Sequence, residues 1–167
     1  SVTPDAEFMV NFTDSYSDTT VAYNLAMQQA AAGCKFIMGS VASSANQGIY
    51  QAALELAGKG TPIYTSGLSV DQTTADNPYI VTGLTKNTGV CTTKIIDDFL
   101  AGAFEGGKEI LGFADDAFCV VGISFDAKFR NEEIITDSVL DAGRKAAEDI
   151  KTGAVVLEVP LEADYKG

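Results

Sequence analysis

Histidine is absent from the 167 residues, which removes the commonest general base and the commonest metal-binding side chain. No GxSxG elbow is present either, so a serine nucleophile would lack both its usual setting and its usual base. The sequence contains no GxxxxGKS or GxxxxGKT loop, and no GxGxxG segment follows the first expected strand. These absences argue against an enzyme, and we expect no catalytic residues, no cofactor and no metal.

Basic residues are also few. There are 11 Lys and Arg against 23 Asp and Glu, which gives a formal net charge of −12. A nucleic-acid partner needs a basic face to neutralise phosphates, so none is expected. The hydrophobic content of 46% is ample for one packed core, and the chain is expected to form a single domain over residues 1–167.

Cysteine is sparse and carries no metal-binding or redox spacing. Cys34, Cys91 and Cys119 lie far apart in apolar segments, with no CxxC pair. We expect buried, reduced thiols that act as small hydrophobic side chains, with one disulfide as the alternative. No signal peptide, lipidation cysteine or membrane-spanning run is found, so the residues are expected to be either cytoplasmic or a mature or truncated piece.

Strand-like and helix-like segments alternate along most of the chain, which predicts a mainly parallel sheet with helices on both faces. Strands are expected at 7–12, 35–38, 62–65, 79–83, 109–113, 118–122 and 155–159. Helices are expected at 18–32, from about 46 to 58, from Lys86 to the glycine pair at 106–107, and at 131–150. The helix after Lys86 is expected to bury Val90, Ile95, Ile96 and Phe99.

Candidate ligand-binding residues follow from this pattern, because the carboxyl ends of parallel strands meet at one edge of a sheet. Right-handed crossovers would bring Tyr16, Ser43, Ser44 and Ser66 to that edge, and Lys86 follows another strand. Tyr16 offers a flat ring for stacking and a hydroxyl for hydrogen bonding.

Each of these positions also has an ordinary structural interpretation. Asp18 orients a helix N-terminus that could bind ligand atoms, but it could equally be a simple N-cap. Ser44 or Asn46 could cap the second helix, and Lys86 could be a plain surface lysine.

Several motifs, in their order, resemble the basic membrane protein family of solute-binding lipoproteins, the purine nucleoside receptor type. The motifs that show this resemblance are the DSYSD loop at 14–18, GIYQAA at 48–53, VTGLTKN at 81–87 and GAFEGG at 102–107. The resemblance runs over about residues 7–160 and concerns the later half of a two-lobe protein.

This resemblance implies a class I periplasmic-binding-protein-like lobe, the second lobe with its returning segment. It implies an extracytoplasmic component of an ABC importer, anchored to the membrane through a lipid that this chain lacks. Its partners would be a permease and a small molecule, with a purine nucleoside favoured. Tyr16, Asp18, Ser43, Ser44, Ser66 and Lys86 would contact the ligand.

Two departures from the family pattern affect the sugar end of such a ligand. Ser66 stands where the family has a ribose-binding aspartate, with Asp71 nearby, and the glycine-rich loop has become ASSA at 42–45. A serine cannot give a sugar diol the charged hydrogen bonds of a carboxylate. Two alternatives remain at this stage: a ligand-sensing module of a signalling system, and a small flavodoxin-like enzyme.

Overall fold

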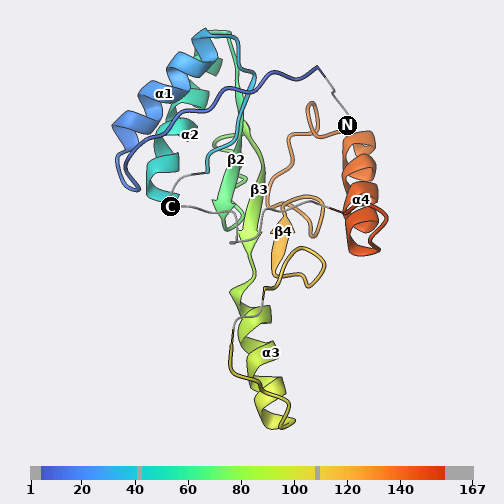
Figure 1. Ribbon diagram of the computed structural model, residues 1–167. Coiled ribbons are helices and arrows are strands. Elements are labelled where there is room, and N and C mark those ends of the chain that lie inside the picture. Colours follow the sequence, from blue (N-terminus) through green and yellow to red (C-terminus); the bar gives the residue numbers. More distant parts are fainter. Residues whose placement is uncertain (1–4, 41–42, 108–109, 157–167) are drawn as a thin grey trace.

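The computed structural model describes residues 5–40, 43–107 and 110–156 of the chain (Figure 1). Its elements, in chain order, are α1 (Thr19–Ala31), β1 (Phe36–Ile37), α2 (Ser43–Gly58), β2 (Tyr64–Ser69), β3 (Ile80–Lys86), α3 (Thr88–Leu100), β4 (Phe118–Val120) and α4 (Asp137–Lys151). The strands form one sheet in the order β1-β2-β3-β4. The first three strands are parallel, and β4 runs antiparallel to β3.

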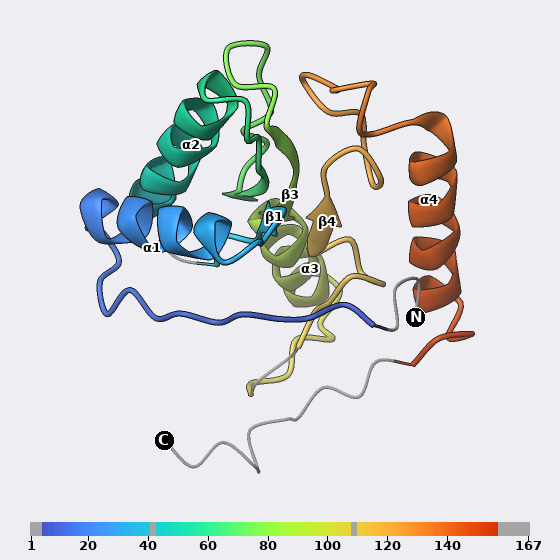
Figure 2. The same ribbon diagram turned by 90° about the horizontal axis from the view of Figure 1, so that it is seen from above.

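The sheet lies between helices, as the alternating pattern predicts. Helices α1 and α2 lie on one side of it and α4 on the other (Figure 2). The expected α/β architecture, a mainly parallel sheet within three layers, is therefore confirmed.

The main core lies between the sheet and the pair α1 and α2. Alanines supply much of this contact: Ala22 and Ala26 from α1 and Ala45, Ala52 and Ala53 from α2 are buried. Small side chains let the two helix backbones approach closely, and Gly48 lies directly against α1. A Cβ atom there would lie 2.1 Å from the carbonyl oxygen of Thr19.

The start of α2 and the end of β2 differ from expectation. The helix begins at Ser43, so Ser44 and Asn46 lie inside its first turns and neither is the cap. Strand β2 continues to Ser69, four residues beyond the expected end at Thr65, because it pairs with β3 as far as Thr85. Tertiary pairing has here extended a strand through Gly67, which a local pattern assigns to a loop.

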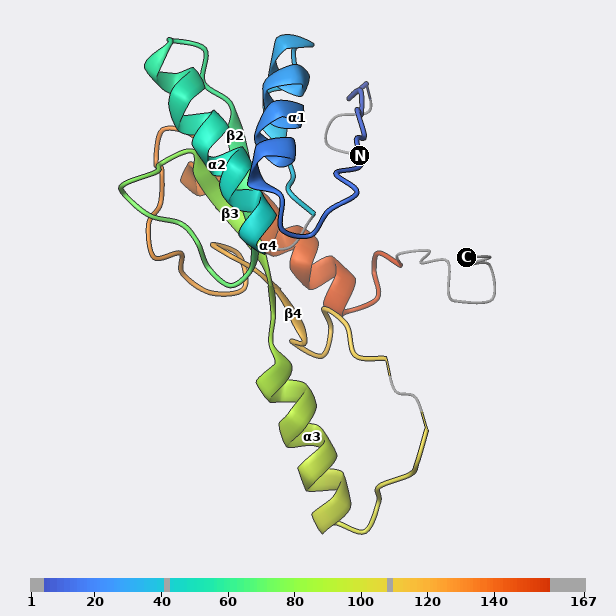
Figure 3. The same cartoon turned by 90° about the vertical axis from the view of Figure 1, so that its left-hand side faces the viewer.

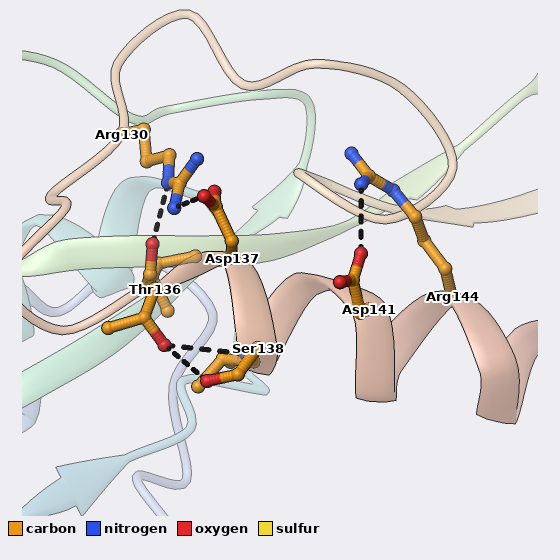
Figure 4. A network of polar contacts seen from close by, with 8 residues as sticks. Arg130, Thr136, Asp137, Ser138, Asp141 and Arg144 are labelled. Atoms are coloured by element: carbon orange, nitrogen blue, oxygen red, sulfur yellow. Dashed lines mark hydrogen bonds and ion pairs between the residues drawn. The ribbon is translucent and has the colours of Figure 1, made fainter.

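Helix α4 begins later than predicted, at Asp137 instead of Asn131. The side chain of Thr136 caps it by accepting a hydrogen bond from the amide of Val139. Arg130 holds the preceding turn, because its Nε donates to the carbonyl of Ile135 at 2.6 Å and its guanidinium pairs with Asp137 at 2.8 Å (Figure 4). Asn131 is used elsewhere: its side-chain amide donates to the carbonyl of Pro78.

Three expected strands are not found. Residues 7–12 run past α1 without joining the sheet (Figure 2). Residues 110–113 form no strand, and 108–109 lie outside the described residues. Residues 155–156 form no strand either, and the rest of that expected segment is not described. A strand needs a paired neighbour, and the pattern of one segment cannot show whether a neighbour is available.

Helix α3 (Thr88–Leu100) differs most from expectation. It begins close to Lys86 as expected, but it ends at Leu100, well before the glycine pair at 106–107, and Gly102 already has a positive φ of 70°. The helix projects away from the sheet beyond the end of β3 (Figures 1 and 3). None of its residues is buried, so the prediction that it buries Val90, Ile95, Ile96 and Phe99 is wrong. No helix within the described ranges has the length and apolar content needed to cross a membrane.

Candidate functional site

The loop before α1 and the start of α2 are joined by a direct hydrogen bond. The Ser44 hydroxyl donates to the backbone carbonyl of Tyr16 at 3.0 Å. The Tyr16 side chain itself is 82% exposed, so its ring faces solvent and is free for a stacking contact. The structure thus brings two of the predicted ligand residues together, although they are separated by 28 positions in the sequence.

Asp18 is the N-cap of α1. One carboxylate oxygen accepts from the amides of Thr20 and Val21 at 2.9 and 3.0 Å, which satisfies two of the free donors of the first turn. The capping interpretation of Asp18 is therefore confirmed. Any contribution of Asp18 to ligand binding would come through the N-terminus of α1, which it holds in place. Ser43 is the first residue of α2, and the structure describes its backbone position alone.

Ser66 and Lys86 lie on the neighbouring strands β2 and β3. Ser66 is buried and pairs with Thr82, so it lies inside the sheet instead of following a strand end. Lys86 is the last residue of β3, opposite Phe118 of β4, and it is exposed. Its ammonium makes no hydrogen bond or ion pair with the described residues. Ser66 is paired with Thr82, and Lys86 lies four positions beyond Thr82, or about 13 Å along the strand. The side chains of Ser66 and Lys86 therefore cannot contact the same ligand atom.

A polar network that the sequence did not predict joins helix α2 to the loop that follows β2. The Tyr50 hydroxyl donates to Oε1 of Gln72 at 2.6 Å, and the same oxygen accepts from the amide of Leu68 at 2.9 Å. Burial raises the pKa of the Tyr50 hydroxyl, and a hydrogen bond with Asn46 opposes this shift. The network connects the first turns of α2 to the loop that follows β2.

Asn46 extends this network toward β1. It is fully buried, and its amide nitrogen donates to the carbonyl of Gly39 at 3.3 Å. Its side-chain oxygen is buried without a hydrogen-bond partner. A signal for this role was present in the sequence: Asn46 precedes Ile49 by three positions and Ala53 by seven, so a polar residue occupies the apolar face of the helix.

Asp71 joins the loop after β2 to the segment after β4. Its carboxylate accepts from the amide and hydroxyl of Thr73 at 2.9 and 2.7 Å and from the amide of Lys128 at 2.8 Å. Desolvation, the largest single influence, raises the pKa of Asp71. The hydrogen bonds from Thr73 and Lys128, together with the Lys128 charge, outweigh it and hold that pKa below its usual value. Asp71 thus serves the fold, by joining the loop after β2 to the segment around Lys128.

An open hollow of about 450 Å³ lies beside this junction. Its lining includes Asp71, Thr73, Thr74, Lys128 and Phe129. None of the predicted ligand residues is among the described residues that line it. The hollow and the Tyr16–Ser44 region are therefore separate features of the surface, and the candidate site remains the latter.

Replacing Asp71 by asparagine should lower stability at neutral pH and matter less in acid. Because its folded-state pKa is depressed, its contribution is present above the unfolded-state pKa, near 4, and is lost as pH falls through the folded value. We expect a loss of about 1 kcal/mol at pH 7, since the group is partly solvated, and a smaller difference from wild type below about pH 4.

Urea unfolding of both proteins from pH 2.5 to 7 measures this difference. Asp76→Asn is the matched control, because that carboxylate lies in the same loop and is exposed. It should change stability by less than about 0.5 kcal/mol at every pH. A difference between Asp71→Asn and wild type that stays constant with pH would contradict the assignment.

Comparison with known proteins identifies the family. The profile described as ABC transporter substrate-binding protein PnrA-like (Bmp) matches residues 1–160. The chain belongs to the Bmp family. This result confirms the resemblance carried by the DSYSD, GIYQAA and VTGLTKN segments. No match was found among curated proteins.

Solved structures similar to this Bmp family member include ABC transporter solute-binding proteins from Aeropyrum pernix K1 (20% identity, TM-score 0.75) and Conexibacter woesei DSM 14684 (15% identity, TM-score 0.66). A transcriptional activator of the comK gene from Bacillus halodurans is also similar (14% identity, TM-score 0.69). The matches cover 98%, 92% and 87% of this chain, in that order, but 50%, 47% and 47% of the solved chains. At these identities the likeness shows the fold, and the Bmp chain spans about half the length of these proteins.

Proposed function

We propose that this chain is one lobe of a two-lobe, extracytoplasmic solute-binding protein that delivers a purine nucleoside to an ABC permease. The family match over residues 1–160 carries the proposal. The half-length match to solved solute-binding proteins supports the second lobe, and the exposed Tyr16 ring supports a planar ligand. A lipid anchor outside these residues would hold the protein at the membrane.

The ligand would bind at the Tyr16–Ser44 region when the two lobes close around it. The Tyr16 ring would stack on the base. The Ser44 hydroxyl, already donating to the Tyr16 carbonyl, keeps lone pairs that accept from ligand N–H groups, and Ser43 would add a second hydroxyl. Lys86 would reach polar substituents from the end of β3, while Ser66 would lie deepest, within the sheet.

Thermal-shift measurements on a two-lobe polypeptide that contains these residues test the proposal. Adenosine, guanosine and inosine should raise the melting temperature, because a ligand at 100 times its Kd adds about 2.7 kcal/mol of stability. Riboflavin, a hexose and a mixture of amino acids serve as competing classes and should cause no shift. A shift with one of these classes and with no nucleoside would refute the nucleoside assignment.

Ligand sensing is the second candidate, and one neighbour favours it. The Bacillus halodurans protein, with a similar fold, is described as a transcriptional activator of the comK gene. Both candidates share the same ligand-binding step, so the thermal-shift experiment does not separate them. A ligand-dependent complex with a permease supports import, and a ligand-dependent complex with a signalling protein or a promoter supports sensing.

A further inference from the structure

The carboxyl ends of β1 and β2 are tied together by side chains that belong to neither strand. Tyr50 of α2 donates from its hydroxyl to Oε1 of Gln72 at 2.6 Å. The same oxygen accepts from the amide of Leu68, a residue of β2, at 2.9 Å. On the β1 side, the Asn46 amide nitrogen donates to the carbonyl of Gly39 at 3.3 Å, and Asn46 also bonds the Tyr50 hydroxyl. We call Asn46, Tyr50 and Gln72 the strand-end clamp.

The backbone beside the strand-end clamp leaves room for its side chains. A Cβ atom at Gly39 would lie 2.6 Å from Oδ1 of Asn46, and one at Gly67 would lie 3.2 Å from Oε1 of Gln72. Each strand end therefore has glycine where a clamp residue lies against the backbone. A side chain at Gly39 would displace Asn46, because the first distance is shorter than Cβ contacts in folded proteins.

Two features of this region work against stability. Asn46 is fully buried, and its side-chain oxygen has no hydrogen-bond partner among the described residues, which destabilises a fold. Ser69, the last residue of β2, has a φ of 72°, which a residue other than glycine adopts only when its surroundings enforce it. Strain of this kind collects at functional sites, where a pre-formed arrangement is retained although it destabilises the protein.

The strand-end clamp lies beside the candidate ligand residues. Asn46 belongs to the opening turn of α2, which also carries Ser44. At the other end of the clamp, Ser69 is paired with Thr85, the residue before Lys86. The groups expected to contact a ligand thus lie on two parts of the molecule, the start of α2 and the ends of β2 and β3, and the clamp joins these parts.

We propose that Asn46, Tyr50 and Gln72 are positioning residues of the ligand site, because they hold the start of α2 against the end of β2 so that a ligand meets groups already in place. Asn46 and Tyr50 are buried, so they act through the residues that they hold. Binding to pre-formed groups is tighter, because less conformational freedom is lost on association. The proposal rests on the proposed function for the location of the site.

Titration of adenosine into a two-lobe polypeptide that contains this chain tests the proposal. Tyr50→Phe removes the hydroxyl from the clamp and should weaken binding about fivefold, the equivalent of one ordinary hydrogen bond. Tyr23→Phe is the matched control, because it also removes a tyrosine hydroxyl that donates at 2.6 Å, here to Glu55. Glu55 lies about 18 Å along α2 from Ser43, so this control should bind adenosine within about twofold of wild type.

Substitutions of Gln72 test the mechanism by rescue. Gln72→Met keeps the length of the side chain but removes its strong acceptor, so it should lose affinity as Tyr50→Phe does. Gln72→Glu keeps acceptor oxygens for the Tyr50 hydroxyl and the Leu68 amide, and it should bind within about twofold of wild type. Hydrogen exchange of the Leu68 amide in the ligand-free protein should be at least about threefold faster in Tyr50→Phe and Gln72→Met and unchanged in Gln72→Glu and Tyr23→Phe.

The outcomes separate this proposal from the proposed function. Wild-type affinity in both Tyr50→Phe and Gln72→Met would make the clamp a purely structural feature and overturn the proposal, while nucleoside binding would stand. Equal losses in Gln72→Glu and Gln72→Met, or unchanged Leu68 exchange in Gln72→Met, would also overturn it. If the wild type binds another class of ligand and no nucleoside, the nucleoside assignment fails, and the affinities of the same variants for that ligand decide whether the clamp positions the site.

Discussion

Replacing Gly48 by alanine is expected to destabilise the protein by about 2–3 kcal/mol and to lower its melting temperature by about 5–10 °C. The added Cβ would lie 2.1 Å from the Thr19 carbonyl oxygen and 2.7 Å from the Tyr23 amide nitrogen. Both neighbours are backbone atoms of α1, so no side chain can turn away and the helices must separate. This cost exceeds the gain of about 1 kcal/mol that alanine brings to a helix interior.

Gly58→Ala is the matched control, because it makes the same change in the same helix. A Cβ at Gly58 meets nothing within 4 Å. Its unfolding free energy should stay within about 0.5 kcal/mol of wild type or rise slightly. Thermal denaturation of the two variants under one set of conditions decides the matter. If the two substitutions prove equally tolerated, the close approach of α1 and α2 is refuted.

The contact that makes Gly48 sensitive also shows what a sequence can predict. Helices α1 and α2 and the short strand β1 follow rules of a few residues' range, and all three were predicted. The α1 cap at Asp18 was likewise readable as a local side-chain to backbone interaction. The three-layer arrangement then follows from alternation of the elements.

Features that depend on distant neighbours were harder to predict. The pattern of α3 is correctly amphipathic, and its apolar residues are the ones that a core would take, but the sequence cannot say which body provides that core. Residues 7–12 likewise have a strand-like pattern, but they form no strand in the structure. Both errors have the same cause: the pattern of one segment was used to predict burial or strand pairing, and both depend on what lies beside that segment.

The candidate ligand residues are arranged only partly as the sequence suggests. Tyr16 and Ser44 were expected to lie near each other, and the Ser44 hydroxyl donates to the Tyr16 carbonyl at 3.0 Å. Ser66 was expected after a strand, but the pairing of β2 with β3 places it inside the sheet. The link between Tyr50 and Gln72 joins residues 22 positions apart, and no local pattern predicts such a pair.

Tyr16→Ala is expected to weaken nucleoside binding by about 10- to 100-fold, since stacking a base on an aromatic ring contributes about 1–3 kcal/mol. The ring is 82% exposed, and its hydroxyl makes no hydrogen bond with the described residues. Its removal should therefore change the ligand-free melting temperature by less than about 1 °C. Isothermal titration of adenosine into the two-lobe polypeptide measures the loss of affinity.

Tyr16→Phe separates the ring from the hydroxyl in this measurement. It keeps the stacking surface, so binding within about threefold of wild type assigns the contribution to the ring. A loss as large as that of alanine would instead place the hydroxyl in contact with the ligand. Wild-type affinity in Tyr16→Ala would remove Tyr16 from the site. Because the Ser44 hydroxyl bonds the backbone carbonyl of Tyr16, neither substitution disturbs the loop, and the comparison isolates what the side chain does.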